Sequence, residues 1–289
     1  MSFRRPYILL KKLGLITGEQ KLLSTRCRDS NEICVLEDSD TGVIYLDWPE
    51  KKVHKINYSD TRDTSKNFCL EDLHNTTSRI NEVLPFVGNE KILDFGCGDG
   101  SFLNEISKFL GKKKCIGIEA SENARFKLEE NGISSFQDLK DLDEKVSLIC
   151  CFHVLEHLDQ PELILNSFRN LLSVTKGYLI IEVPHSNDPL LRLYNNQEFK
   201  NFTFWSQHLI LHNDKSLRAL CNHAGFSEVN IVLKQRYPLS NHLNWLIEGK
   251  PGGHKSKFAL IDNDNLNNLY ANSLIKMGYS DTIVAICKF

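Results

Sequence analysis

The sequence predicts an α/β protein with a doubly wound, mostly parallel sheet and a small N-terminal module. From residue 91 onward, short apolar runs typical of strands alternate with longer segments of helical period, the pattern of parallel strands joined by helical crossovers. Before residue 85 the pattern differs, because two short apolar runs flank a turn-rich segment and a polar stretch leads to one helix. We therefore place the N-terminal module at residues 1–84 and the main domain at residues 85–289.

The main domain is expected to contain strands at residues 91–95, 114–119, 133–136, 146–152, 177–183, 229–233 and 281–288. Helices are expected between them at residues 101–110, 122–131, 161–174, 215–224 and 263–276. Pro161 suits the first turn of its helix, and Gly225 follows the last periodic residue of its helix as a C-cap does. Segments at about 185–212 and 234–262 fall outside the alternation, and we interpret them as substrate-binding insertions.

The N-terminal module has its own order of elements. Apolar runs at residues 33–36 and 43–46 flank the turn-rich residues 38–42, which predicts a hairpin. A helix is expected at residues 70–84.

Composition narrows the class of protein. The 289 residues are 41% hydrophobic and 25% charged, as in a soluble globular protein. Lys and Arg number 35 against 37 Asp and Glu, so no global charge recruits nucleic acid or an anionic membrane. No apolar run is long enough for a membrane span or a signal peptide. The nine cysteines lie mostly in apolar runs, which indicates buried thiols and a cytoplasmic protein.

A glycine-rich turn joins the first expected strand to the first helix, with Asp94 followed by Gly96, Gly98 and Gly100. Glycines let backbone approach a ligand closely and tolerate positive φ. A dinucleotide fingerprint would place its third glycine one position later, so pyrophosphate binding is disfavoured. The second strand ends in Glu119, an acid that can accept hydrogen bonds from two ribose hydroxyls. The pattern predicts a site for a ribose without a pyrophosphate.

This combination resembles the nucleotide-binding half of class I S-adenosylmethionine-dependent methyltransferases. Residues 150–157, followed by Asp159 and Pro161, look like that family's fourth-strand segment, which lies beside the methionine part of the cofactor. The resemblance covers about residues 85–185 and implies a seven-stranded, Rossmann-like methyltransferase fold. It implies S-adenosylmethionine as cofactor and S-adenosylhomocysteine as product. The implied cofactor-binding residues are Asp94, Phe95, Gly96, Cys97, Gly98, Glu119, Ala120, Gln137, Asp138, Phe152, His153 and His157.

Methyl transfer from a sulfonium is an in-line displacement, and a hydroxyl nucleophile also needs a base, commonly histidine. The catalytic candidates are His208 first, then His157 and His185, because each follows a strand or lies in a loop that should reach the pocket. Residues 204–226 resemble a segment of sugar methyltransferases in which a Glu-His pair precedes a helix ending in Ala-Gly-Phe. Here Gln207 replaces the acid, so His208 is expected to lack an adjacent carboxylate. A structural role for a lone histidine is the alternative.

Residues 234–257 form a basic segment with five cations against one acid, a formal charge of +4. Cations and glycine amides suit a phosphate, and aromatic rings suit a sugar face. The segment also resembles surface-polysaccharide methyltransferases, in which Pro-Gly-Gly-His precedes a helix and an Asp-Thr strand. The resemblance implies a nucleotide-linked or phosphorylated sugar of capsule or lipopolysaccharide synthesis; a solvated basic loop is the alternative. The expected substrate-binding residues are Trp205, Arg236, Tyr237, Lys250, His254 and Lys255.

Residues 27–50 resemble the hairpin of a zinc module that precedes some sugar methyltransferases. Only Cys27 and Cys34 lie near the hairpin, with Cys69 and His74 far downstream, whereas structural zinc usually takes a pair two to four residues apart. We therefore expect no metal.

O-methylation is favoured over N- or C-methylation, with a small-molecule sugar as substrate and neither nucleic acid nor membrane as partner. A homodimer is compatible with the sequence. Two other functions stay open: a small-molecule methyltransferase of quinone or secondary metabolism, and a non-catalytic partner protein that binds S-adenosylmethionine.

Overall fold

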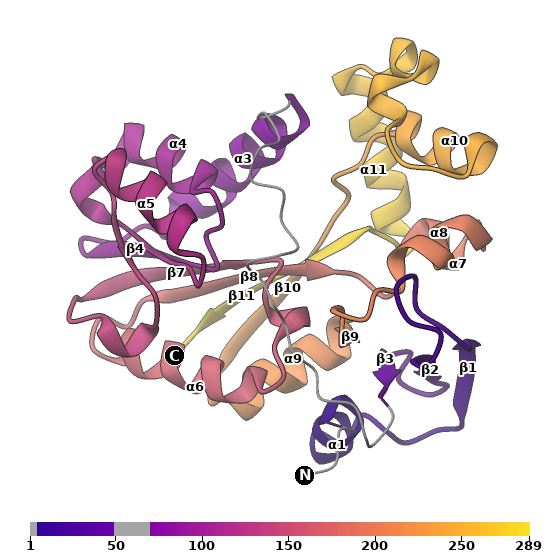
Figure 1. Ribbon diagram of the computed structural model, residues 1–289, viewed down its shortest axis with the longest axis horizontal. Coiled ribbons are helices and arrows are strands. Elements are labelled where there is room, and N and C mark those ends of the chain that lie inside the picture. Colours follow the sequence, from indigo (N-terminus) through magenta and orange to yellow (C-terminus); the bar gives the residue numbers. More distant parts are fainter. Residues whose placement is uncertain (1–4, 49–69) are drawn as a thin grey trace.

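The computed structural model describes residues 5–48 and 70–289, which form a seven-stranded sheet covered by helices and a smaller sheet beside it (Figure 1). The strand order of the large sheet is β10-β11-β8-β7-β4-β5-β6. Its parallel strands are β4 (Lys91–Phe95), β5 (Cys115–Ile118), β6 (Ser134–Phe136), β7 (Val146–Phe152) and β8 (Tyr178–Pro184). One strand, β11 (Thr282–Lys288), pairs antiparallel with both β8 and β10 (Glu228–Lys234). The predicted fold class is confirmed.

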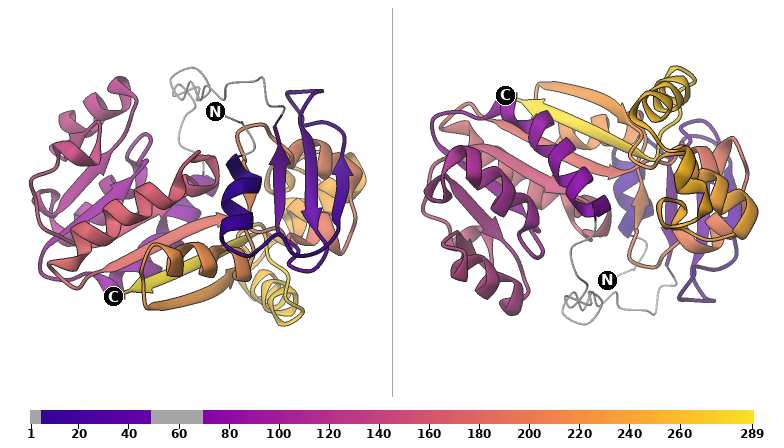
Figure 2. Two further views of the ribbon diagram at one scale, coloured as in Figure 1. Left: turned by 90° about the horizontal axis from the view of Figure 1, so that it is seen from below. Right: turned by 90° about the horizontal axis from the view of Figure 1, so that it is seen from above.

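Helices cover both faces of this sheet (Figures 1 and 2). One face carries α3 (Leu70–Val83), α4 (Ser101–Leu110) and α5 (Glu122–Glu130), and the other carries α6 (Pro161–Ser173) and α9 (Asp214–His223). Alternate strand residues therefore enter two hydrophobic cores. Ile92 and Leu148 pack with the α3 and α4 side, whereas Leu93 and Ile149 pack with α6 and α9. Burial on both faces explains why these strands are nearly continuous apolar runs.

The predicted strands and helices of the main domain are present, with bounds that differ by at most a residue or two. Several elements were not predicted: α1 (Arg5–Lys12), α7 (Pro189–Arg192), α8 (Gln197–Thr203) and α10 (Leu239–Glu248). Short 3₁₀ helices complete the chain: η1 (Leu84–Phe86), η2 (Lys112–Lys114), η3 (Leu139–Asp141), η4 (Leu155–His157), η5 (Gly253–Lys255) and η6 (Lys257–Ile261). The last two pack with α10, and α11 (Asp264–Lys276) contacts β10, so these elements form a lobe at the β10 end of the sheet (Figure 1).

The N-terminal residues form a four-stranded sheet with the order β1-β2-β3-β9. The predicted hairpin is present, because β2 (Cys34–Asp38) pairs antiparallel with β3 (Ile44–Asp47), and the unpredicted β1 (Gln20–Ser24) pairs with β2. The fourth strand, β9 (Ile210–Leu211), comes from the main domain, so the two sheets are tied together through residues near 210. Helix α3, which the sequence analysis places in the N-terminal module, packs on α4 of the main domain. The domain boundary proposed near residue 84 stays a prediction.

The two cysteines of the hairpin region are thiols with backbone partners. Cys27 is 2% exposed, and burial raises the pKa of its thiol to about 12. Its Sγ donates to the Ile33 carbonyl at 3.6 Å, and the Cys34 Sγ donates to the Thr25 carbonyl at 3.7 Å. Cys69 and the side chain of His74 lie outside the described residues.

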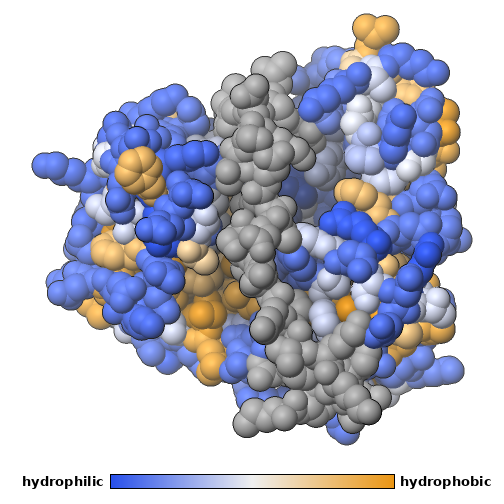
Figure 3. Space-filling model, in the orientation of Figure 1, coloured by the Kyte–Doolittle hydropathy of each residue, from blue (hydrophilic) through white to orange (hydrophobic). Residues whose placement is uncertain are grey.

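None of the helices in the described parts of the chain is long and apolar enough to cross a membrane. On the face shown in Figure 3, hydrophobic residues form several small groups within a largely hydrophilic surface.

Candidate active site

The glycine loop lies at the carboxyl edge of the large sheet, between β4 and α4. Gly96, Gly98 and Gly100 have φ angles of 73°, 56° and 75°, which other residues rarely adopt. The Gly96 N–H donates to the Ile118 carbonyl at 2.8 Å, which fixes the loop to the end of β5. A Cβ at Gly96 would lie 2.4 Å from the Val154 Cγ2, so a side chain has no room there. The conformation of the loop is therefore fixed by contacts with the end of β5 and with Val154, which follows β7.

Glu119 is held beside this loop by two backbone amides. Its Oε2 accepts the Gly98 N–H at 2.9 Å and its Oε1 accepts the Ser121 N–H at 2.9 Å. A carboxylate oxygen has two acceptor positions, so each oxygen can still accept a hydroxyl. The arrangement fits the two hydroxyls of a ribose.

The other residues implied for the cofactor differ in burial. Asp94 and Cys97 are buried, and Phe95 stacks edge-to-face on Phe168 with ring centres 5.0 Å apart. Ala120, Gln137 and Asp138 are exposed at the ends of β5 and β6. The Asp138 carboxylate accepts the Lys140 N–H, which lowers its pKa.

At the end of β7, His153 has a φ of 54° and turns its ring toward β8. Its N–H donates to the Glu182 carbonyl at 2.8 Å, and its Nε2 lies 3.0 Å from the Glu182 Oε1. Phe152 packs on Phe102, and the Arg79 guanidinium lies 4.7 Å above the Phe152 ring. The implied residues Phe152 and His153 are therefore fixed by α3, α4 and β8.

Glu182 is a buried acid that the sequence analysis did not single out. Its side chain is 1% exposed, and it binds Arg79 at 2.5 Å and Lys234 at 2.9 Å. Burial alone would raise the pKa of Glu182, but His153 and Arg79 hold it well below its usual range. The signal that could have identified Glu182 is its position as an acid within the apolar residues of a predicted strand. Acidic residues are rarely buried without partners, so such a position indicates buried partners of opposite charge.

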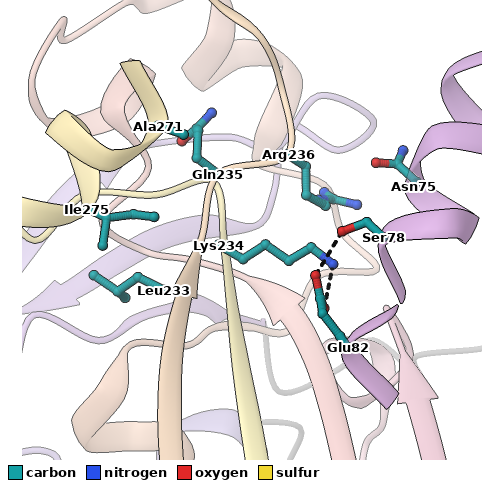
Figure 4. Close-up of a pocket in the computed structure, with 9 residues that line it drawn as sticks. All are labelled: Asn75, Ser78, Glu82, Leu233, Lys234, Gln235, Arg236, Ala271 and Ile275. Atoms are coloured by element: carbon teal, nitrogen blue, oxygen red, sulfur yellow. Dashed lines mark hydrogen bonds and ion pairs between the residues drawn. The ribbon is translucent and has the colours of Figure 1, made fainter. Parts of the chain in front are cut away.

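A cavity of about 240 Å³ opens at this edge of the sheet, between α3, the end of β10 and α11 (Figure 4). Arg236 lines the cavity, but its Nε lies 3.4 Å from the Asp281 Oδ1. Lys234 lines it too, and its ammonium reaches Glu82 and Glu182 at 2.8 and 2.9 Å. Two cations of the basic segment are therefore neutralised by acids, which leaves less charge for a phosphate than the sequence indicates.

A second cavity, of about 410 Å³, lies at the amino ends of β7 and β8, where Ser147 and Tyr178 line it. Ligands of open α/β sheets bind at the carboxyl ends of the strands. The larger cavity is therefore on the wrong edge for the site.

The remaining residues implied for substrate are divided between two places. The Tyr237 N–H donates to the Asp281 Oδ2 at 2.9 Å, beside the cavity of Figure 4. In the lobe of α10 and α11, Lys250 and Lys255 are exposed and His254 is partly buried. None of the three lines that cavity.

Two of the three catalytic candidates come together with an aromatic ring. His157 on η4 and His208 have ring centres 4.9 Å apart, and the Trp205 ring lies 5.2 Å from that of His208. The His157 Nδ1 donates to the Gln207 carbonyl at 2.8 Å. His185 lies apart from this pair. It is buried with its Nδ1 3.0 Å from the Ser280 Oγ, and burial lowers its pKa to about 4.

The structure corrects the expectation that His208 has no carboxylate near it. Glu156, from η4, places its carboxylate with the ring nitrogens of His157 and His208, all within 4.8 Å of one another. Burial nevertheless lowers the pKa of His208 to about 4, and Glu156 only partly opposes this. The carboxylate was missed because it comes from a position far from His208 in the sequence.

The family model of a methyltransferase domain matches residues 70–231, more than half of the chain. The chain belongs to this family. It is an S-adenosylmethionine-dependent methyltransferase, and the glycine loop with Glu119 fits its cofactor. A comparison with curated protein sequences finds no match.

Solved structures resemble this methyltransferase at low sequence identity. The protein bound to the Trm112 methyltransferase activator of Haloferax volcanii is 14% identical, with a TM-score of 0.51 over 75% of this chain and 91% of that one. A SAM-dependent methyltransferase from Archaeoglobus fulgidus is 21% identical, with a TM-score of 0.49 over 76% and 94%. One from Thermotoga maritima is 20% identical, with a TM-score of 0.48 over 76% and 91%. The likeness to the Haloferax volcanii protein supports the fold and says nothing of the substrate.

Proposed function

We propose that this methyltransferase methylates a hydroxyl group of a sugar, one that is nucleotide-linked or otherwise phosphorylated, in the cytoplasmic synthesis of a surface polysaccharide. The observation that carries the proposal is a polar wall, a cluster of polar side chains at the ends of β7 and β8. The cluster consists of His153, Glu156, His157 and Glu182, the first three from the segment that follows β7. Trp205 adds an aromatic face next to His157 and His208, which suits the apolar face of a sugar ring.

The cofactor, when bound, supplies a methyl carbon on a positively charged sulfur. That methyl group would go to the substrate oxygen, with the electron pair of the broken carbon–sulfur bond left on sulfur and the hydroxyl proton passed to a base or water. The residues of this chain position the hydroxyl and accept its proton or direct it to water. His157 and His208 lie where they could contact it, next to the Glu156 charge.

The same wall argues against a quinone or another flat apolar substrate. Such a ligand calls for an apolar lid, and burying charged side chains against it would leave them without water or partners. The phosphate part of the proposal rests on the exposed Lys250 and Lys255, because Lys234 and Arg236 are bound to acids.

A screen tests the proposed substrate class. The purified protein and S-adenosylmethionine are incubated with a panel of nucleotide sugars, the matching free sugars and a set of quinone precursors, and products are detected by mass as the gain of one methyl group. We expect methylated product from at least one nucleotide sugar and none from the quinone precursors. Methylation confined to the quinone precursors would contradict the proposal, and so would faster turnover of the free sugar than of its nucleotide-linked form.

A further inference from the structure

Glu156, His157 and His208 form a cluster of three donor groups outside the cofactor loop. One oxygen of Glu156 and one ring nitrogen of each histidine lie within 4.8 Å of one another. Two of the residues are consecutive on η4, and the third is brought beside them by the Leu209 N–H, which donates to the Glu156 carbonyl at 2.8 Å. The cluster is therefore fixed by backbone on both sides.

The histidine rings are oriented as metal ligands are. Because the His157 Nδ1 donates to the Gln207 carbonyl, the lone pair of that ring is on Nε2, which lies 3.8 Å from the Glu156 Oε1. A backbone carbonyl on the second ring nitrogen is the usual device that orients a metal-binding histidine. The His208 Nδ1 is buried and has no hydrogen-bond partner.

Glu156 is the more unusual member. Its side chain is 1% exposed, and neither carboxylate oxygen accepts a hydrogen bond. The nearest side-chain nitrogen outside the cluster is the His153 Nδ1, at 3.4 Å from the Glu156 Oε1. A buried carboxylate without hydrogen bonds is costly, because its lost hydration is not replaced. A cation among the three groups would replace it.

We propose that Glu156, His157 and His208 bind a divalent first-row cation, Zn²⁺ or Mn²⁺ in chemical class, with at least one coordination position open to substrate. Two nitrogens and one carboxylate oxygen match such ions, whereas Mg²⁺ and Ca²⁺ prefer oxygen donors throughout. Ligands at about 2.1 Å from one ion are at most about 4.2 Å apart, so binding would draw these side chains inward by less than about 1 Å.

The site would have a role in the proposed O-methylation, and this role rests on that proposed function. A substrate hydroxyl bound to a divalent cation loses its proton more readily. A sugar hydroxyl could then be activated without a strong base beside it. Metal binding itself does not depend on the identity of the substrate.

Metal binding by the full chain tests the proposal directly. The purified protein is stripped with a chelator and titrated by calorimetry with ZnCl₂ and MnCl₂, and with CoCl₂ by visible absorption. We expect one equivalent of metal per chain and a Co²⁺ spectrum of nitrogen and oxygen ligands. His208→Ala and His157→Gln should weaken binding at least a hundredfold, whereas His223→Ala, which changes an exposed histidine on α9, should bind as wild type does.

Thermal melts of each variant establish that it folds, and the two ligand variants provide independent tests if one of them does not. The proposal would be overturned if the stripped protein bound none of the three ions, or if folded His208→Ala and His157→Gln bound them as tightly as wild type. If the protein binds metal at this site but methylates no sugar, the result would support the metal site and contradict the proposed function.

Discussion

At the scale of single residues, Glu119 shows how backbone geometry prepares a side chain for a ligand. Its two oxygens accept the N–H groups of Gly98 and Ser121, one from the glycine loop and one from the start of α5. These bonds fix the carboxylate, so little side-chain entropy would be lost if Glu119 binds the ribose of the cofactor, as we propose. The same carboxylate joins the glycine loop to the residues that follow β5.

We expect Glu119→Gln to weaken the binding of S-adenosylmethionine about tenfold to a hundredfold, or about 1.4 to 2.8 kcal/mol. The amide keeps the size of the side chain but turns one acceptor into a donor, which faces a backbone N–H, and removes the charge that strengthens hydrogen bonds to hydroxyls. Calorimetric titration measures the affinity. Glu122→Gln, at an exposed position in the first turn of α5, is the matched control. Equal affinities for both variants would remove Glu119 from the ribose site.

The geometry of the glycine loop could be predicted from the sequence, whereas the positions of the buried acids Glu156 and Glu182 could not. Gly96 and Gly98 lie on one continuous strand-turn-helix unit, so their spacing alone defines the geometry. Glu156 and Glu182 acquire their meaning only when distant segments meet, since their neighbours include His208 and Lys234. A single sequence holds no record of such contacts, and His208 could therefore be identified as a candidate without its carboxylate.

At the scale of elements, the N-terminal module fixes the loop that carries Trp205 and His208. The Arg28 N–H donates to the Phe204 carbonyl at 2.7 Å, and the Arg28 guanidinium lies 4.6 Å above the Trp205 ring. The Asp29 carboxylate accepts the Ser206 N–H at 3.0 Å and the Ser206 hydroxyl at 2.6 Å. The module therefore contacts the candidate active site through the loop that carries Trp205 and His208.

We expect Asp29→Ala to lower turnover severalfold while the affinity for S-adenosylmethionine stays within about twofold of wild type. The substitution frees residues 204–208, so His208 is less well positioned, but it leaves the glycine loop unchanged. Glu19→Ala, which removes an exposed acid from the same module, should leave both quantities unchanged. A fall in cofactor affinity without a change in turnover would contradict this positioning role.

The elements that the sequence analysis missed had signals that were interpreted differently. Pro238 and Gly249 bound α10 as its N-cap and its left-handed C-cap, but the charge of residues 234–257 and the Pro-Gly-Gly turn at 251–253 led to the interpretation of this segment as a substrate-binding insertion. The two residues of β9 are too few to show a period, and only pairing with β3 defines them as a strand. Long apolar strands such as β7 and β8 were predicted because burial on both faces leaves a continuous hydrophobic run.

At the scale of the whole molecule, neutral histidines are buried where the parts of the chain meet. His185 and His212 form a bridge between the end of β8 and the segment before α9, and His242 on α10 contacts the Tyr270 hydroxyl at 2.6 Å. All three are at most 3% exposed, and burial lowers the pKa of each to about 4. The junctions between the large sheet, the N-terminal module and the α10 lobe therefore depend on imidazoles that carry no charge.

We expect the free energy of unfolding to decrease as the pH falls from about 6.5 to 4.5. In the unfolded chain these histidines have pKa values near 6.5, so in this range the unfolded state binds more protons than the folded state, and acidification favours it. Each histidine contributes up to about 1.4 kcal/mol per pH unit. Glu182 affects stability at lower pH than the histidines do. Its pKa is lowered in the folded protein, so its contribution to stability is lost only as the pH falls below the pKa of an unfolded glutamate, near 4.3.

Denaturant unfolding at several pH values between 7.5 and 4.5 measures this slope. His212→Gln should flatten it, because the amide has no proton to gain, while the exposed His223→Gln should leave it unchanged. Comparison of slopes separates the pH effect from any loss of stability that the buried substitution itself causes, since that loss is the same at every pH. A wild-type profile that is level from pH 6.5 to 4.5 would mean that these histidines become protonated within the folded protein, and that the junctions open to water before the molecule unfolds.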